Sequence, residues 1–174
     1  PLMLIVSGPS GSGKTTLAKS LADSLAMDLL RTDVVRGEIP ADITKSAERY
    51  APESRDAVYR EMLRRTDRML SEGVSVVLDG TFAVPELRYE TLALASKFGA
   101  EAKIIVCHCP AEIAESRVAM RLAEGNDASE IRPELLEVQR KSFIPPTGPE
   151  VIDVDTTTDI KSQVEHVFNL LRPV

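Results

Sequence analysis

The sequence has 174 residues, a net charge of −6 and a pI near 5.1. Its length suits a single core, so we expect one domain over residues 1–174. The acidic balance argues against a broad nucleic-acid-binding surface, which depends on many Lys and Arg contacts to phosphate. Because the apolar runs are too short to span a membrane and no signal peptide is expected, we predict a cytoplasmic protein.

Apolar runs alternate with helical patterns along the chain. Residues 2–6 form an unbroken apolar run, which is typical of a parallel strand covered on both faces. We expect helices over 15–30, 52–72, 86–98, 110–124, 132–143 and 160–171, and further strands over 29–31, 74–79, 102–107 and 151–154. This order predicts an α/β fold with three α/β/α layers, a five-stranded, mainly parallel sheet, and ligands at the carboxyl ends of the strands.

A phosphate-binding motif follows the first expected strand. Residues 8–15 match G-x-x-x-x-G-K-[ST] between an apolar strand and an amphipathic helix, which is the context that a Walker A motif requires. Glycines let backbone N–H groups turn inward, and the helix N-terminus favours an anion. Lys14 can reach the β- and γ-phosphates, and the Thr15 hydroxyl can ligate Mg²⁺. The expected nucleotide-binding residues here are Gly8, Pro9, Ser10, Gly11, Ser12, Gly13, Lys14, Thr15 and Thr16.

Asp79 ends the apolar strand expected over 74–79, which has the form of a Walker B segment. We expect Asp79 to lie beside the phosphate-binding loop, where it would join Thr15 at the metal site and orient a magnesium-bound water or the acceptor. The alternative is that Asp79 only caps the turn after its strand.

Asp33 and Arg36 form a D-x-x-R element directly after the second expected strand. In this topology the strand ends next to the phosphate site, so Asp33 is placed to accept the proton of an incoming hydroxyl. Arg36 could hold the acceptor or the transferring phosphoryl group. The alternative is a turn-capping Asp33 and a solvated Arg36.

Arg117 and Arg121 are four residues apart on one expected helix and therefore share a face. We interpret the segment from about 110 to 143 as a short helical lid whose two arginines neutralise charge on the transferring phosphate. Residues 125–127, Gly-Asn-Asp, would let this lid move. The alternative is a solvated face in which the arginines pair with Glu112 or Glu124.

Two further patterns favour structural roles. Arg60, Arg64 and Arg68 share a helical face, but interleaved acidic residues favour a solvated face over a basic track. Cys107 and Cys109 flank a histidine, yet a zinc site needs three or four ligands, so we expect two packed, reduced thiols.

These segments together resemble a family of small P-loop kinases related to polynucleotide 5′-hydroxyl kinases, zeta toxins, chloramphenicol phosphotransferases and gluconate kinases. The resemblance spans residues 2 to about 154 and rests on the phosphate-binding loop, the D-x-x-R element, the strand end at 78–81 (Leu-Asp-Gly-Thr), and residues 117–139 with Asp127-Ala128-Ser129. It implies ATP as the donor and Mg²⁺ as the metal. It also implies that Asp33 is the general base, that Arg36 lies on the acceptor side, and that Arg117 and Arg121 contact the donor phosphates.

The function expected from the sequence is an ATP-dependent kinase that transfers the γ-phosphoryl group of ATP to a hydroxyl. The acceptor is either a small, nucleotide-sized molecule or a nucleic-acid 5′ end. The alternative is a regulatory P-loop NTPase that hydrolyses nucleotide without an acceptor. Neither the N-K-x-D guanine-reading motif nor the D-x-x-G switch element is present, and their absence weighs against that alternative.

Overall fold

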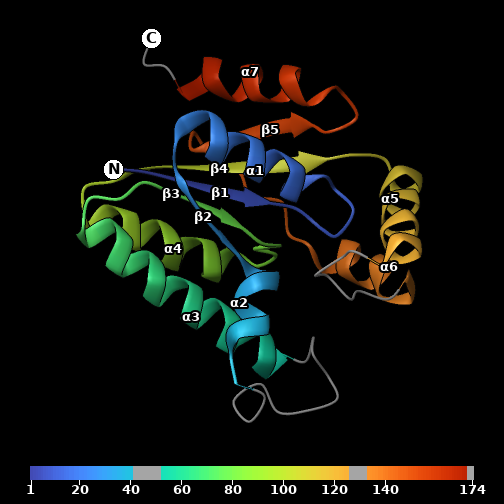
Figure 1. Cartoon of the computed structure of the whole chain (residues 1–174), viewed down its shortest axis with the longest axis horizontal. Coiled ribbons are helices and arrows are strands. Elements are labelled where there is room, and N and C mark those ends of the chain that lie inside the picture. Colours follow the sequence, from blue (N-terminus) through green and yellow to red (C-terminus); the bar gives the residue numbers. More distant parts are fainter. Residues whose placement is uncertain (41–51, 126–132, 172–174) are drawn as a thin grey trace.

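The computed structural model describes residues 1–40, 52–125 and 133–171. Five strands form one sheet in the order β2-β3-β1-β4-β5 (Figure 1), and every pair of neighbours is parallel. The strands are β1 (Leu2–Ser7), β2 (Asp28–Arg31), β3 (Val76–Asp79), β4 (Glu101–His108) and β5 (Val151–Asp155). The expected five-stranded sheet is therefore confirmed, and it is parallel throughout.

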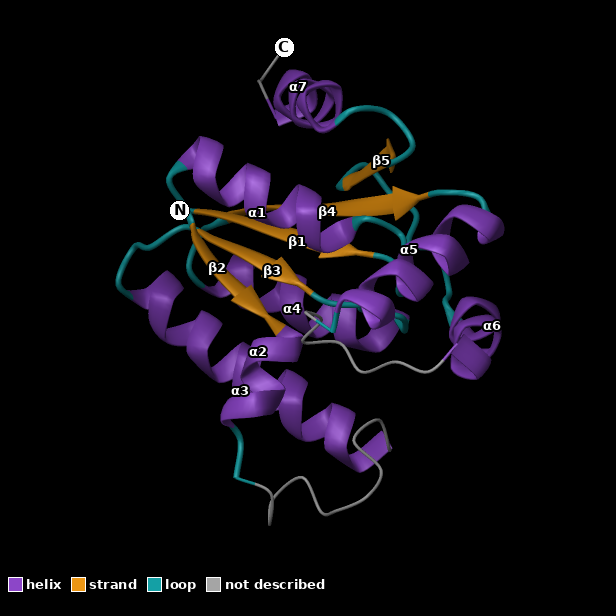
Figure 2. Cartoon of the chain, turned by 45° about the vertical axis from the view of Figure 1, so that its right-hand side comes forward, coloured by secondary structure: helices purple, strands orange, loops and turns teal. Residues whose placement is uncertain are grey.

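Helices cover both faces of this sheet (Figure 2). One layer holds α1 and α7, and the opposite layer holds α3 and α4. The described helices are α1 (Lys14–Leu25), α2 (Thr32–Glu38), α3 (Pro52–Ser71), α4 (Pro85–Lys97), α5 (Ala111–Glu124), α6 (Pro133–Ser142) and α7 (Ile160–Leu171). None of them, within the described ranges, is long and apolar enough to cross a membrane.

The side chains of β1 explain why its sequence is continuously apolar. Leu4 and Val6 pack into the cluster under α1 and α7, whereas Met3 and Ile5 pack into the cluster under α3 and α4. All four side chains are fully buried because the strand is central and has a helical layer on each side. This burial holds the end of β1, and the loop that follows it, in a fixed position.

The structure differs from the expected pattern on both sides of the second strand. The helix expected over 15–30 ends at Leu25, because Ala26 adopts a left-handed conformation and the Met27 N–H bonds to the Ala22 carbonyl at 2.9 Å. Those bonds satisfy carbonyls at the end of the helix and turn the chain into β2. After β2 the chain forms α2, a short helix that the sequence pattern did not indicate.

The two helices of the expected lid lie together at one end of the sheet. α5 and α6 are placed beyond the carboxyl ends of the strands (Figure 1), and Val118 packs against Leu136 between them. Residues 126–132 lie outside the described residues, and they include the Asn-Asp of the expected hinge and the Asp127-Ala128-Ser129 segment. The motion of this lid stays a prediction.

Candidate active site

The loop between β1 and α1 is a turn built on left-handed backbone. Gly11 and Gly13 have φ angles of 76° and 86°. A Cβ atom on Gly11 would lie 2.4 Å from the Ala114 carbonyl oxygen of α5, and one on Gly13 would lie 2.9 Å from Cβ of Thr156. No larger residue fits these positions without displacing a neighbour. The glycines of the motif therefore let the loop curl tightly against α5 and the end of β5.

Thr15 and Asp79 meet where β3 ends beside the first turn of α1. The Thr15 hydroxyl donates to Oδ2 of Asp79 at 2.8 Å, and Nε of Arg31 lies 3.2 Å from the same oxygen. Asp79 is only 3% exposed, and its Oδ1 has no hydrogen-bond partner among the described residues. A hydroxyl beside a carboxylate with a free oxygen is the type of donor set that Mg²⁺ prefers. The residues present therefore fit a magnesium ion or its bound water.

Arg31 is part of this site that the sequence analysis missed. Arg31 ends β2 and stands opposite Asp79 in the parallel register between β2 and β3. In the sequence, Arg31 is recognisable only as a basic residue at the carboxyl end of a short expected strand. Its acidic partner is determined by the strand order, which the sequence pattern does not contain.

Two cavities meet at Lys14. The first has a volume of about 310 Å³ and is lined by the phosphate-binding loop, Arg117, Arg121 and Thr156. The second has a volume of about 520 Å³ and is lined by Ser10, Asp33 and Arg36, together with residues of α3, α4 and α6. Lys14 lines both. A group held at the Lys14 ammonium could therefore be approached from either side.

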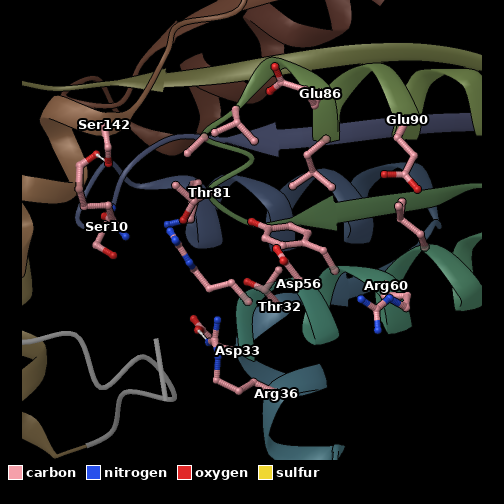
Figure 3. A pocket seen from close by; sticks show the side chains of 18 residues that line it. Ser10, Thr32, Asp33, Arg36, Asp56, Arg60, Thr81, Glu86, Glu90 and Ser142 are labelled. Carbon is pink, nitrogen blue, oxygen red and sulfur yellow. Dashed lines mark hydrogen bonds and ion pairs between the residues drawn. The ribbon is translucent and has the colours of Figure 1, made fainter. Parts of the chain in front are cut away.

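Asp33 and Arg36 lie in the second cavity as an ion pair (Figure 3). Arg36 Nη1 is 2.7 Å from Asp33 Oδ1, and their side chains are 8% and 21% exposed. The pair follows from α2, because residues three apart on a helix share a face. The alternative of a solvated Arg36 is thus not what the structure shows. The guanidinium instead holds one oxygen of the Asp33 carboxylate in place.

Arg117 forms hydrogen bonds with the phosphate-binding loop and with Thr156, the residue that follows β5. Its Nη1 donates to the Gly11 carbonyl at 3.2 Å and to the Thr156 hydroxyl at 3.1 Å, and its Nη2 donates to the Thr156 carbonyl at 2.6 Å. Arg121 lines the same cavity one turn later on α5. Arg117 therefore does not pair with Glu112 or Glu124. Thr156 was missed by the sequence analysis, although it is a hydroxyl residue placed directly after β5.

The loop after β3 forms another wall of the second cavity. The Tyr59 hydroxyl accepts from the Phe82 N–H at 3.0 Å, and the buried Arg88 donates to the Phe82 carbonyl at 2.7 Å. Burial raises the pKa of Tyr59 to about 12, so its hydroxyl stays protonated at neutral pH. Thr81 links this loop to the end of β1, since its carbonyl accepts a hydrogen bond from the Ser7 hydroxyl at 2.7 Å. These contacts hold the loop rigidly beside the phosphate-binding loop.

Within the part of the chain that the structure describes, the two cysteines belong to no cluster of metal-ligating side chains. Cys107 is buried in the core, and Cys109 Sγ lies 3.5 Å from the Gly11 carbonyl oxygen. The histidine between them contacts Asp153 instead, with 2.6 Å between His108 Nε2 and the carboxylate. Both thiols are free.

Known proteins are similar to this chain over most of its length. The family described as AAA domain (AAA_33) matches residues 3–146. An uncharacterized protein of Mycobacterium tuberculosis (strain ATCC 25618 / H37Rv) is 28% identical over 136 residues, which is 73% of this chain and 27% of that protein. The chain thus spans about a quarter of the length of this protein and of two further mycobacterial relatives that it matches.

Solved structures share the architecture. A gluconokinase from Sinorhizobium meliloti 1021 superposes with a TM-score of 0.76 at 19% identity, covering 98% of this chain and 91% of that one. Kti12 from Chaetomium thermophilum, in complex with ADP-AlF3, superposes with a TM-score of 0.75 at 17% identity, covering 99% of this chain and 100% of that one. These likenesses show the fold of P-loop kinases. Together with the match over residues 3–146, they show that the chain belongs to the AAA domain family of P-loop proteins.

Proposed function

We propose that this protein is an ATP-dependent kinase that transfers the γ-phosphoryl group of ATP to a hydroxyl of a small molecule. The observation that carries the proposal is the position of Lys14, which lines both cavities. A P-loop lysine reaches the β- and γ-phosphates. A terminal phosphate held there would face the second cavity, where Asp33 and Arg36 lie.

The first cavity is proposed to hold the donor nucleotide. The loop N–H groups and the N-terminus of α1 would bind the phosphates of the nucleotide. Arg117 and Arg121 would lie beside the nucleotide, because both line this cavity. Thr15 and Asp79 would hold Mg²⁺, directly or through water. When bound, the ion supplies positive charge that offsets the charge on the phosphate oxygens.

Asp33 is proposed as the general base of the transfer. As the acceptor oxygen forms its bond to the γ-phosphorus, the bond to the β–γ bridging oxygen breaks and ADP leaves. The hydroxyl proton passes to the Asp33 carboxylate, whose orientation is held by Arg36 at 2.7 Å. A positioned base of this kind contributes about 10²- to 10⁴-fold in rate.

The second cavity favours a small acceptor over a nucleic-acid 5′ end. Its volume of about 520 Å³ lies within the range of small-molecule sites. Its outer walls carry both charge signs. Arg55 lines the cavity, as do Arg60, Asp56, Glu86 and Glu90, which Figure 3 labels. A polynucleotide backbone would require an excess of positive charge. The likeness to a gluconokinase fold agrees with a small acceptor.

The proposal is tested with labelled ATP, Mg²⁺ and a panel of acceptors. The panel contains neutral sugars, sugar acids, amino sugars, nucleosides and an oligonucleotide with a free 5′ hydroxyl. We expect a small molecule to be labelled. In Asp33→Asn the rate should fall about 10²- to 10⁴-fold while ATP affinity is retained. Asp67→Asn, which alters an exposed carboxylate paired with Lys97, is the matched control and should change neither.

Two outcomes would overturn this assignment. If no acceptor is labelled and ATP turnover is the same in Asp33→Asn, the protein is a nucleotide-hydrolysing regulatory domain. If only the oligonucleotide is labelled, the acceptor class is a nucleic-acid end.

A further inference from the structure

A side chain of α6 reaches the phosphate-binding loop. The Ser10 N–H donates to Oε1 of Gln139 at 2.6 Å, and these residues are 129 positions apart in the sequence. The chain just after α6 is fixed independently, because the Ile144 N–H donates to the Ala83 carbonyl at 3.0 Å. α6 is therefore held against both the phosphate-binding loop and the loop after β3.

The contact with Ser10 determines which way the Gln139 amide is turned. A main-chain N–H can only donate, so its partner must be the amide oxygen of Gln139. The amide nitrogen, with two N–H donors, then lies on the opposite side of the group. Within residues 1–40, 52–125 and 133–171, that nitrogen has no hydrogen-bond acceptor. The side chain thus has an anchored oxygen and two donors that remain available.

Gln139 also lines the second cavity, together with Ser10, Lys14 and Asp33. Lys14 lines the first cavity as well. The amide of Gln139 is therefore anchored to the same loop that carries Lys14, and it lines the cavity that Asp33 also lines. Donors held rigidly where negative charge develops stabilise a transition state more than mobile water does, because they need no reorganisation.

We propose that Gln139 is a catalytic residue that donates a hydrogen bond from Nε2 to a non-bridging oxygen of the transferring phosphoryl group, while Ser10 anchors its Oε1. The identity of that group rests on the proposed function. Lys14 brings a positive charge to the phosphoryl oxygens, whereas Gln139 brings a neutral, directed donor from α6. The reaction would thereby depend on α6 lying against the phosphate-binding loop.

A purely structural role makes a different prediction. If Gln139 only pins α6 to the loop, losing it should weaken every nucleotide alike through the loop geometry. If Gln139 contacts the transferring phosphoryl group, the loss should be confined to ligands that carry a group at that position. Mg²⁺ with ADP, and Mg²⁺ with ADP and aluminium fluoride, form the matched pair of probes, since the fluoride complex imitates the phosphoryl group in transfer.

The test compares Gln139→Ala and Gln139→Glu with the parent protein by calorimetric titration of both probes. Gln139→Glu keeps an oxygen for the Ser10 N–H but replaces the donors with a carboxylate oxygen. We expect ADP affinity to stay within about twofold in both variants. Affinity for the aluminium fluoride complex should fall about 10- to 100-fold in Gln139→Ala, and further in Gln139→Glu. The control is Glu137→Gln, an exposed change on the same helix that removes only a pair with Lys141.

Equal losses for the two probes, or no loss for either, would overturn the role of Gln139. If Gln139→Ala does not fold, as judged by its melting temperature, Gln139→Glu alone decides. None of these titrations needs an acceptor. A negative acceptor panel with unchanged ATP turnover in Asp33→Asn would therefore overturn the kinase proposal, and the titrations would still decide whether Gln139 contacts the phosphoryl position.

Discussion

The hydroxyl of Thr15 donates a 2.8 Å hydrogen bond to the carboxylate of Asp79 and so links the first turn of α1 to the end of β3. The two residues are 64 positions apart, and parallel pairing of β1 with β3 brings them together by placing Val6 opposite Asp79. Arg31 holds the same carboxylate oxygen from β2. The second oxygen is left for a ligand, since no described residue bonds to it.

Asp79→Asn should raise the Mg²⁺ concentration needed for half-maximal nucleotide turnover by about 10- to 100-fold. The substitution keeps the shape of the side chain but removes the negative charge beside Thr15. Titration of activity with Mg²⁺ at saturating nucleotide measures the effect. Asp23→Asn, on the exposed side of α1, is the control and should leave the curve in place. An unchanged curve in Asp79→Asn would show that the carboxylate does not serve the metal.

Arg117→Lys should raise the KM for ATP by about 10-fold or more and leave the KM for the acceptor unchanged. Three hydrogen bonds join Arg117 to Gly11 and Thr156, and an ammonium cannot reproduce the forked geometry of a guanidinium. Steady-state kinetics with each substrate varied in turn measures both constants. Arg68→Lys, in an exposed pair with Glu72, should alter neither. Equal increases in both constants would place Arg117 outside the donor site.

Gly11→Ala should destabilise the protein more than Gly73→Ala and should also abolish nucleotide binding. The two glycines have φ angles of 76° and 78°, so both substitutions carry the cost of a left-handed alanine, about 1–2 kcal/mol. Only Gly11 would place its Cβ against α5, 2.4 Å from the Ala114 carbonyl, whereas Gly73 has open space. Urea unfolding and ADP titration measure the difference. If the two substitutions lower the free energy of unfolding equally, α5 can shift away from the loop without a measurable energetic cost.

The stability of the protein should fall as the pH rises above about 9. Burial raises the pKa of the Cys107 thiol from 9.0 to about 12, so between these values the unfolded chain has lost a proton that the folded chain keeps. The folded state is therefore favoured below pH 9, and this contribution is lost as pH rises toward 12. Tyr59 adds to the effect, because burial raises its pKa from 10.0 to about 12.

Urea unfolding at pH 8 and pH 10.5 measures this loss. Cys107→Ala should have a lower free energy of unfolding at pH 8, since it leaves a small cavity in the core. Its further loss between the two pH values should nevertheless be smaller than that of the parent protein. Cys109→Ala, which changes the less buried thiol, is the control. An identical pH-dependent loss in Cys107→Ala would rule out this thiol as a contributor.

Local patterns predicted those parts of the site whose chemistry is contained in a short segment. The motif at residues 8–15 indicated the phosphate-binding loop because glycines, a lysine and a threonine must follow one another at fixed spacing. The alternation of apolar runs and helical patterns indicated the α/β class and the buried central strand. The D-x-x-R element after the second expected strand grouped Asp33 with Arg36, and four-residue spacing on one expected helix grouped Arg117 with Arg121. Each pair lines one of the two cavities.

Only the tertiary structure decided which distant groups meet at the Thr15–Asp79 pair and around it. Arg31 reaches Asp79, Thr156 reaches Arg117 and Gln139 reaches Ser10 because of the strand order and the placement of α5 and α6. The strand order cannot be predicted from local periodicity, because the pattern of a strand indicates how that segment is buried but not which strand lies beside it. The sequence by itself determined the phosphate-binding loop, whereas long-range packing decided the two cavities that meet there and the side chains that line them.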